Sequence, residues 1–166
     1  MRGNHMNNLN QYIKHYNQQL SLGHIQKAYR GIMEMMSQLK ITWDNQYPET
    51  PSGALYAGYM DMTFISVKPA VLSDRDVRVS IVYLHESHTF ELWLVARNRK
   101  IQSQIHDQLK TKDLGPYTLS ELGPGIDSII AMTCIADPDF DNTEKLIMEI
   151  IEKTQHFITD MVGLVR

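Results

Sequence analysis

The sequence predicts an α+β fold in which helices pack against one mixed, mostly antiparallel sheet. Helical periodicity marks both ends of the chain, and a centre rich in β-branched and aromatic residues alternates every two positions. The length of 166 residues and the hydrophobic content of 43% suit one domain with a real core. We therefore expect a single globular domain over residues 1–166, with the element order α-α-β-β-β-α-β-α. Residues 1–6 are expected to be either disordered or vector-derived.

The N-terminal part predicts two amphipathic helices. Apolar residues within residues 9–20 recur at the spacing of three and four that lines one helix face. Residues 21–23 interrupt this pattern, and a longer stripe follows over residues 25–43 and ends before Pro48, which cannot continue a helix. Because the connection is short, we expect two neighbouring helices that lay their apolar faces on the sheet.

Three strands are predicted in the centre of the chain. Residues 53–67 are rich in aromatic and β-branched residues, and residues 77–83 and 90–96 alternate between two faces. Residues 85–88 close a hairpin between the last two strands. We expect Met60, Met62 and Phe64 to lie under the helices. The opposite face would then collect Tyr59, Asp61, Thr63, Arg78, Ser80, Glu91, Trp93 and Arg97.

The C-terminal part predicts a helix, a strand and a second helix. Asn98 is expected to cap a helix whose apolar stripe covers residues 101–109. Residues 128–135 are apolar without alternation, which predicts an innermost strand covered on both faces. A capping box that begins at Asp141 is expected to open the final helix, whose apolar face runs over residues 146–161.

The composition disfavours several classes of function. A formal charge of −3 gives no global field for binding nucleic acid. No window approaches the roughly 18 apolar residues of a membrane span, and the first residues lack the apolar core of a secretion signal. The single cysteine, Cys134, lies in an apolar run and cannot form an internal disulfide. These features predict a cytoplasmic protein.

Two short motifs resemble metal sites but fail on chemistry. The acidic run at residues 137–141 resembles the start of a calcium loop, yet Asn142 stands at the glycine position and Met148 at the bidentate glutamate position. His85 and His88 lie in a hairpin turn that fixes no third ligand. We therefore predict no metal site and no cofactor.

The order α-β-β-β-α-β resembles the core of restriction-endonuclease-like nucleases. Such enzymes need an acid near the second strand and an acid-x-lysine on the third to hold a divalent metal. Here Glu91 is followed two residues later by Trp93 instead of lysine. An active enzyme of this kind would pair Asp61 or Asp76 with Glu91 around magnesium, with Arg97 assisting. A divergent nuclease stays an alternative, and no catalytic residue is assigned.

The predicted polar face of the sheet has two interpretations. Asp61 is a carboxylate inside a run that predicts buried strand, and Glu91 is a second acid near Arg78 and Arg97. Two acids and two cations on a covered face are typical of a structural ion network, because partly buried charges are normally paired. In the other interpretation the aromatic residues form the wall of a pocket for a small ligand or a peptide. The candidate ligand-binding residues are Tyr56, Tyr59, Asp61, Arg78, Glu91, Trp93 and Arg97.

The preferred functional prediction is a non-enzymatic domain that binds a small molecule or a partner protein. No Gly-rich phosphate loop, nucleophile elbow or dinucleotide fingerprint is present in the sequence. The nuclease is one alternative to this prediction. The other alternative is a scaffold that forms a homodimer through helix edges around Met33, Met35 and Met36.

Three stretches carry a resemblance to a known family. They are GHIQKAYRGIME at residues 23–34, YAGYMDMTF at residues 56–64 and FELWLVARN at residues 90–98. Together they resemble a bacterial family, domain of unknown function 7000, over residues 9–164. The resemblance implies a bacterial, cytoplasmic, single-domain protein, and it brings no catalytic residues to this sequence.

Overall fold

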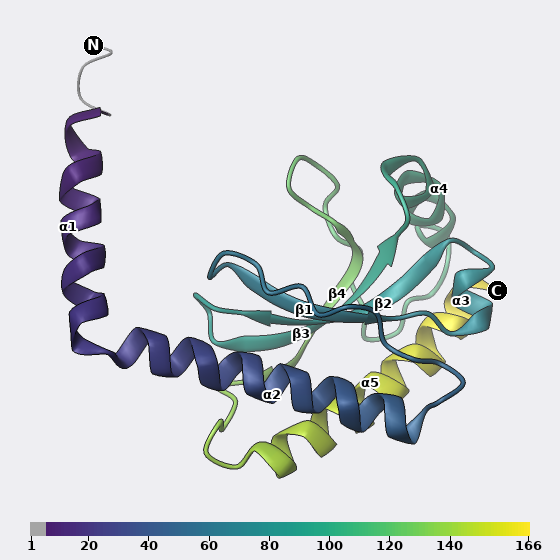
Figure 1. Ribbon diagram of the computed structural model, residues 1–166. Coiled ribbons are helices and arrows are strands. Elements are labelled where there is room, and N and C mark those ends of the chain that lie inside the picture. The colour runs from purple at the N-terminus through teal and green to yellow at the C-terminus, as the bar shows by residue number, and fades with distance from the viewer. Residues whose placement is uncertain (1–5) are drawn as a thin grey trace. The chain divides into compact units, whose positions relative to one another are not determined.

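The computed structural model describes residues 6–166, with side chains from residue 8 onward (Figure 1). The expectation for residues 1–6 lies outside this range except at Met6, where the first helix begins. The chain divides into two compact units, Met1–Glu34 and Met35–Arg166. The single-domain expectation stays a prediction.

The N-terminal unit holds helix α1 (Met6–Leu22) and the first part of helix α2 (His24–Gln46), so both predicted helices are confirmed. Gly23 separates them with a positive φ of 78°, a conformation that glycine adopts without steric cost. The apolar stripe of α1 is not buried within this unit. Its exposed members are Leu9, Tyr12, Ile13 and Tyr16.

The larger unit contains a four-stranded sheet. Its strands are β1 (Met62–Val67), β2 (Val77–Leu84), β3 (Thr89–Ala96) and β4 (Ser128–Ala136), which pair in the order β1-β2-β3-β4. All three pairings are antiparallel, so the α+β class is confirmed and the sheet carries no parallel pair among these strands. The turn between β2 and β3 lies at residues 85–88, as the hairpin prediction expects.

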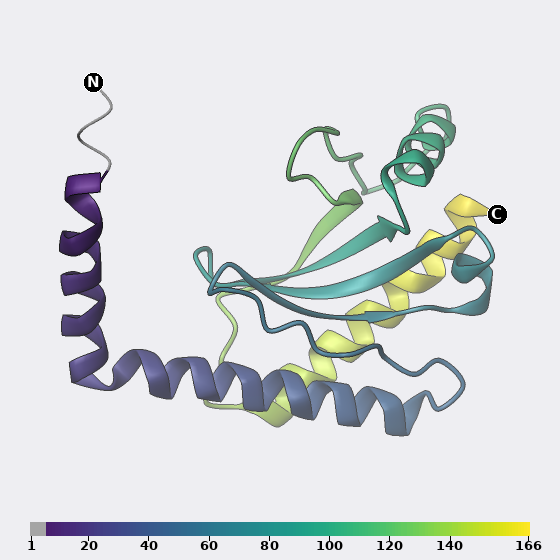
Figure 2. The same cartoon turned by 45° about the horizontal axis from the view of Figure 1, so that its top comes forward.

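Helices cover one face of this sheet. The part of α2 from Met35 onward and α5 (Thr143–Val165) lie on the same face, as both views show (Figure 2). Helix α4 (Arg99–Leu109) lies at one end of the sheet, near the C-terminal end of α5. The short helix α3 (Ala70–Ser73) occupies the predicted turn between β1 and β2. No helix in the described part of the chain has the length and apolarity that crossing a bilayer needs.

The core lies between the sheet and these helices. Strands β2 and β3 present alternate apolar residues to it, because successive side chains in a strand point to opposite faces. The largest fully buried side chains include Trp43 from α2, Phe90 from β3 and Phe157 from α5. Because the apolar side chains of the strands point into this core, the polar side chains lie on the opposite face of the sheet.

The predicted register of the first strand is wrong by one residue. Thr63 is 0% exposed and faces the core, whereas Met62 and Phe64 lie on the opposite face. The Thr63 hydroxyl donates to the carbonyl oxygen of Ala57 at 2.7 Å and lies 2.8 Å from Nε2 of His85. Burial of this polar side chain is therefore supported by hydrogen bonds, which the alternation of apolar residues does not reveal.

Strand β4 is an edge strand and not the innermost one, so that prediction is also wrong. It pairs along its length with β3 alone, and its other side makes one isolated bridge, between Leu119 and Ile130. Ala131 and Thr133 are exposed. An apolar run without alternation thus does not distinguish a central strand from an edge strand that has register shifts.

One helix cap is confirmed and the other is not. The Asn98 side chain accepts a hydrogen bond from the backbone N–H of Ile101 at 2.9 Å and caps α4. Asn142, not Asp141, stands at the N-cap of α5, and its side chain makes no capping hydrogen bond. The Asp139 carboxylate instead accepts from the Asp141 backbone N–H at 3.0 Å, so the acidic run is stabilised as a turn.

The proposed contact for a homodimeric scaffold is corrected by burial. Met35 and Met36 are 2% and 0% exposed and belong to the core. Met33 is half-buried. A dimer that uses Met35 and Met36 would require the core to open.

His85 makes folding sensitive to acid. Burial lowers the pKa of His85, and the nearby Asp61 charge opposes that shift. The unfolded chain therefore binds this proton at a higher pH than the folded chain does, so the contribution of His85 to stability is fully present above a pH of about 6.5 and is lost as the pH falls through the lowered pKa. We expect urea unfolding midpoints to decrease from about pH 8 to about pH 5. His85→Gln should flatten this slope, and the exposed His156 provides the control as His156→Gln. Equal slopes in both variants would contradict the assignment.

Candidate ligand-binding site

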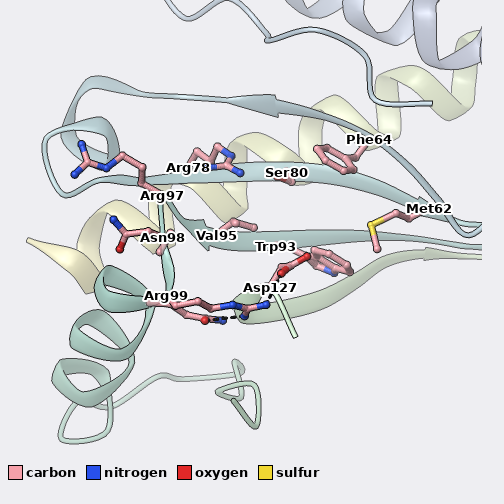
Figure 3. A pocket seen from close by; sticks show the side chains of 12 residues that line it. Met62, Phe64, Arg78, Ser80, Trp93, Val95, Arg97, Asn98, Arg99 and Asp127 are labelled. Atoms are coloured by element: carbon pink, nitrogen blue, oxygen red, sulfur yellow. Dashed lines mark hydrogen bonds and ion pairs between the residues drawn. The ribbon is translucent and has the colours of Figure 1, made fainter. Parts of the chain in front are cut away.

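A pocket of about 310 Å³ lies on the sheet face that points away from α2 and α5 (Figure 3). We call it the open-face pocket. Its wall combines side chains from β1, β2 and β3 with the first turn of α4 and with Asp127, which precedes β4. The residues that carry its chemistry are Phe64, Arg78, Trp93, Arg97, Arg99 and Asp127.

The strand register explains why these side chains meet. Ser80 lies opposite Trp93, and Arg78 lies opposite Val95, in the pairing of β2 with β3. All four residues have the parity that points away from the core, because Val79 and Leu94 point into it. The alternation seen in the sequence thus places one cation and one indole on the same face.

One side of the pocket is cationic. Nη1 of Arg97 lies 3.3 Å from Oδ1 of Asp76, and Nη2 of Arg99 lies 3.0 Å from Oδ1 of Asp127. Arg78 is half-buried and makes no hydrogen bond or ion pair with any other residue from 6 to 166. Three arginines and one aspartate line the cavity, which leaves a formal lining charge of +2 in a chain of net charge −3.

The other side of the pocket is apolar and aromatic. Figure 3 shows Trp93, Phe64 and Met62 together at the end of the cavity away from α4. Nε1 of Trp93 donates to Oε2 of Glu91 at 2.6 Å, which fixes the orientation of the indole ring. The Tyr56 ring stacks on Phe64 from the edge of the sheet, with 4.8 Å between ring centroids.

Only some of the seven predicted ligand-binding residues line the open-face pocket. Arg78, Trp93 and Arg97 line the open-face pocket. Glu91 and Tyr56 do not line the pocket, but they contact Trp93 and Phe64, which do. The remaining two, Tyr59 and Asp61, are exposed and do not line the pocket.

The expectation that Asp61 is a buried carboxylate is wrong. Its side chain is exposed, and Oδ1 accepts a hydrogen bond from the backbone N–H of Tyr59 at 2.9 Å. That hydrogen bond is the main cause that lowers the pKa of Asp61. Gly58 and Met60 have positive φ angles of 73° and 64°, so the chain turns there and β1 begins only at Met62. The carboxylate therefore belongs to the turn and not to the strand.

The predicted ion network on the sheet face is also wrong. Within residues 6–166, no ion pair joins Asp61, Arg78, Glu91 and Arg97 to one another. Arg97 pairs with Asp76, and Glu91 accepts from the indole of Trp93. Arg78 is thereby left to face the cavity without a carboxylate partner among these residues.

A family model for a domain of unknown function (DUF7000) matches residues 9–165. The chain belongs to this family. The resemblance in the three sequence stretches is thereby confirmed, and every residue that lines the open-face pocket lies within the matched range of the DUF7000 domain. No curated protein and no solved structure matches the chain.

Metal ligands do not gather anywhere in the described part of this DUF7000 chain. No group of three or more His, Cys, Asp or Glu side chains there could hold a metal ion. In the acidic turn, Nε2 of His88 lies 3.4 Å from Oδ1 of Asp137, which is one pair and not a cluster. The acids of the nuclease alternative are engaged separately, since Asp76 pairs with Arg97 and Glu91 binds Trp93.

Sequence reasoning missed part of the pocket. Arg99 and Asp127 stand outside the predicted strands, and the pairing that joins them spans 28 positions of the chain. Arg99 also donates to the carbonyl oxygen of Ile126 and, at 2.9 Å, to the side chain of Gln102. The sequence feature that could have identified Arg99 was the run Arg97-Asn98-Arg99, because a helix capped by Asn98 places both arginines near the end of β3.

Proposed function

We propose that this DUF7000 domain binds a small organic ligand in the open-face pocket. The observation that carries the proposal is the cavity itself, where a cationic side and an aromatic side meet. Its volume of about 310 Å³ is at the lower end of the range of roughly 300–1,000 Å³ that small-molecule sites occupy. A concave site of this size favours a small molecule over a partner protein, whose interfaces are larger and flatter.

The pocket is organised before any ligand arrives. Its central residues Arg78 and Trp93 lie on paired strands, and the ring of Trp93 is oriented by Glu91. Arg97 and Arg99 each make an exposed ion pair with an aspartate. A preformed site loses little conformational entropy on binding, so a small ligand can bind with useful affinity. Ligand binding is the function that these contacts support.

The proposal is tested by thermal shift and calorimetry with a panel of small ring compounds: phenol, phenyl phosphate, phenylacetate and benzylamine. We expect at least one to bind saturably and to stabilise the fold by about 2.7 kcal/mol at a concentration of 100 times its Kd. Trp93→Ala should abolish this binding. Tyr59→Ala is the matched control, because Tyr59 is an aromatic residue that is 90% exposed outside the pocket. Absence of saturable binding, or equal losses in both variants, would refute the proposal.

Glu91 is expected to act as a positioning residue for Trp93. Glu91→Ala removes the acceptor of the 2.6 Å hydrogen bond and frees the indole ring. A hydrogen bond to a carboxylate contributes about 1.5–3 kcal/mol, which sets an upper limit of roughly ten- to a hundredfold on the loss of ligand affinity, less than in Trp93→Ala. Calorimetry with the best-binding ring compound measures the loss. The exposed Glu86 gives the charge-matched control, Glu86→Ala, which should bind as the wild type does.

A further inference from the structure

We infer that the ligand is a small anion with a flat ring, whose carboxylate or phosphate binds Arg78 and whose ring stacks on Trp93. This inference rests on the proposed function and adds the chemical class of the ligand. It follows from three features of the open-face pocket: an arginine without an acidic partner, an indole that lines the cavity with its N–H already engaged, and the close spacing of these two residues in the strand register.

The uncompensated charge is the first feature. Arg78 is half-buried in the pocket wall and has no acidic partner among the described residues, whereas Arg97 and Arg99 each have one. A cation partly removed from water is stabilised when an opposite charge comes within contact distance. The missing partner of Arg78 is therefore best supplied by an anionic ligand.

The guanidinium group of Arg78 limits the kinds of anion that fit. A guanidinium group presents paired N–H donors in one plane, which match the two oxygens of a carboxylate or a phosphate. Arg97 and Arg99 also line the cavity, and each is paired with an aspartate (Figure 3). The carboxylates of Asp127 and Glu91 lie close by, so an extended polyanion would meet repulsion. A single anionic group suits this arrangement better than a nucleic-acid backbone does.

The ring site is the second feature. The indole N–H of Trp93 is already occupied by Glu91, so Trp93 offers its ring face and not a hydrogen-bond donor to a ligand. Phe64 and Met62 complete an apolar surface beside it. Flat rings stack on such surfaces, and each aromatic pair adds about 0.5–1.5 kcal/mol beyond area burial.

The distance between the two sites is the third feature. Arg78 pairs with Val95, and Trp93 is two residues from Val95 on the same strand face. The backbone positions of diagonal neighbours of this kind are about 7–8 Å apart, so a ligand that reaches both side chains needs only a few bonds between its ring and its anion. The cavity of about 310 Å³ holds one ring with one anionic group and has no room for a dinucleotide.

Calorimetry with matched probes tests this class. Phenyl phosphate and phenylacetate carry a ring and an anion, phenol carries the ring alone, inorganic phosphate carries the anion alone, and benzylamine reverses the charge. We expect the two ring anions to bind at least tenfold more tightly than the other three, with affinity that falls as salt is added. The ratio between phenyl phosphate and phenylacetate decides between a phosphate ester and a carboxylate as the source of the anion.

Variants of Arg78 test whether this residue binds the anionic group of the ligand. Arg78→Gln should weaken both ring anions about ten- to a hundredfold and leave phenol unchanged. Arg30→Gln is the matched control, since Arg30 is exposed on α2 and does not line the pocket. Arg78→Lys keeps the charge and should recover only part of the affinity. If Arg78→Gln fails to fold, Arg78→Lys and the salt dependence of the wild type carry the same test.

The outcomes separate this inference from the proposed function. Suppose that phenol or benzylamine binds more tightly than the ring anions and that Trp93→Ala abolishes this binding. The requirement for an anion would then be refuted, while the proposed ligand binding would stand. Ring anions that bind equally well to Arg78→Gln and Arg30→Gln would overturn the role of Arg78. Absence of saturable binding by every probe would overturn both the inference and the proposed function.

Discussion

Trp43→Ala is expected to lower the free energy of unfolding by about 3–5 kcal/mol. Trp43 is 0% exposed in the part of α2 that packs under the sheet. Its indole N–H donates to the carbonyl oxygen of Thr50 at 2.8 Å, and its ring lies 4.6 Å from that of Tyr47. Truncation leaves a cavity and an unpaired carbonyl group. Equilibrium unfolding in urea measures the loss, which is a large fraction of the roughly 5–15 kcal/mol that a domain of this size has.

Two further variants define this effect. Ile41 lies on the same helix and is 52% exposed. We expect Ile41→Ala to change the free energy of unfolding by at most about 0.5 kcal/mol. Trp43→Phe keeps a ring but removes the donor to Thr50, which should lose about 1–3 kcal/mol. A loss below about 1 kcal/mol in Trp43→Ala would contradict its place in the core.

The helices were predictable because their signal is long. The apolar stripe that ends at Trp43 repeats over several turns, and a pattern of that length survives single exceptions. The hairpin strands were predictable for the same reason, since their alternation holds on both sides of the turn except at Val82 and Val95, which are apolar residues with the parity of the polar face. These elements place Arg78 and Trp93 on one face of the sheet. This part of the pocket could therefore be predicted from the sequence.

The first strand failed because its signal is short and ambiguous. In the run from Met60 to Phe64 the apolar side chains share one parity, whereas the apolar residues that follow, Ile65 and Val67, have the other. The outcome is decided by the turn at Gly58 and Met60 and by the hydrogen bonds of Thr63, none of which periodicity can show. Asp61 was misplaced by this error, and with it the expected ion network.

The rest of the pocket depends on contacts between distant segments. Asp127 reaches Arg99 across 28 positions, and nothing local to either residue predicts that pair. The edge position of β4 is also a property of strand order, which local composition does not encode. A single sequence therefore identifies the face that carries the site more readily than the full set of residues that line it.

Gly58→Ala is expected to destabilise the fold by at least about 1–2 kcal/mol, because a left-handed conformation alone carries that cost for a residue with a Cβ. Gly58 has a φ of 73°, and an added Cβ would lie 1.9 Å from the carbonyl oxygen of Met62. That oxygen is backbone at the start of β1, so it cannot rotate away as a side chain would. The turn or the strand must shift, and Met62, which lines the pocket, should move with it. Urea unfolding and phenyl phosphate affinity should therefore both decrease.

Gly31→Ala supplies the control with the opposite sign. Gly31 lies inside α2, and an added Cβ there meets nothing within 4 Å. Replacing an interior helical glycine by alanine should stabilise the helix by about 0.5–1 kcal/mol and leave phenyl phosphate affinity unchanged. If Gly58→Ala instead matched the wild type in both measurements, the turn before β1 would be free to relax, and its role in setting the register of β1 would be refuted. Loss of stability with intact affinity would show that the pocket depends on β2 and β3 and not on Met62.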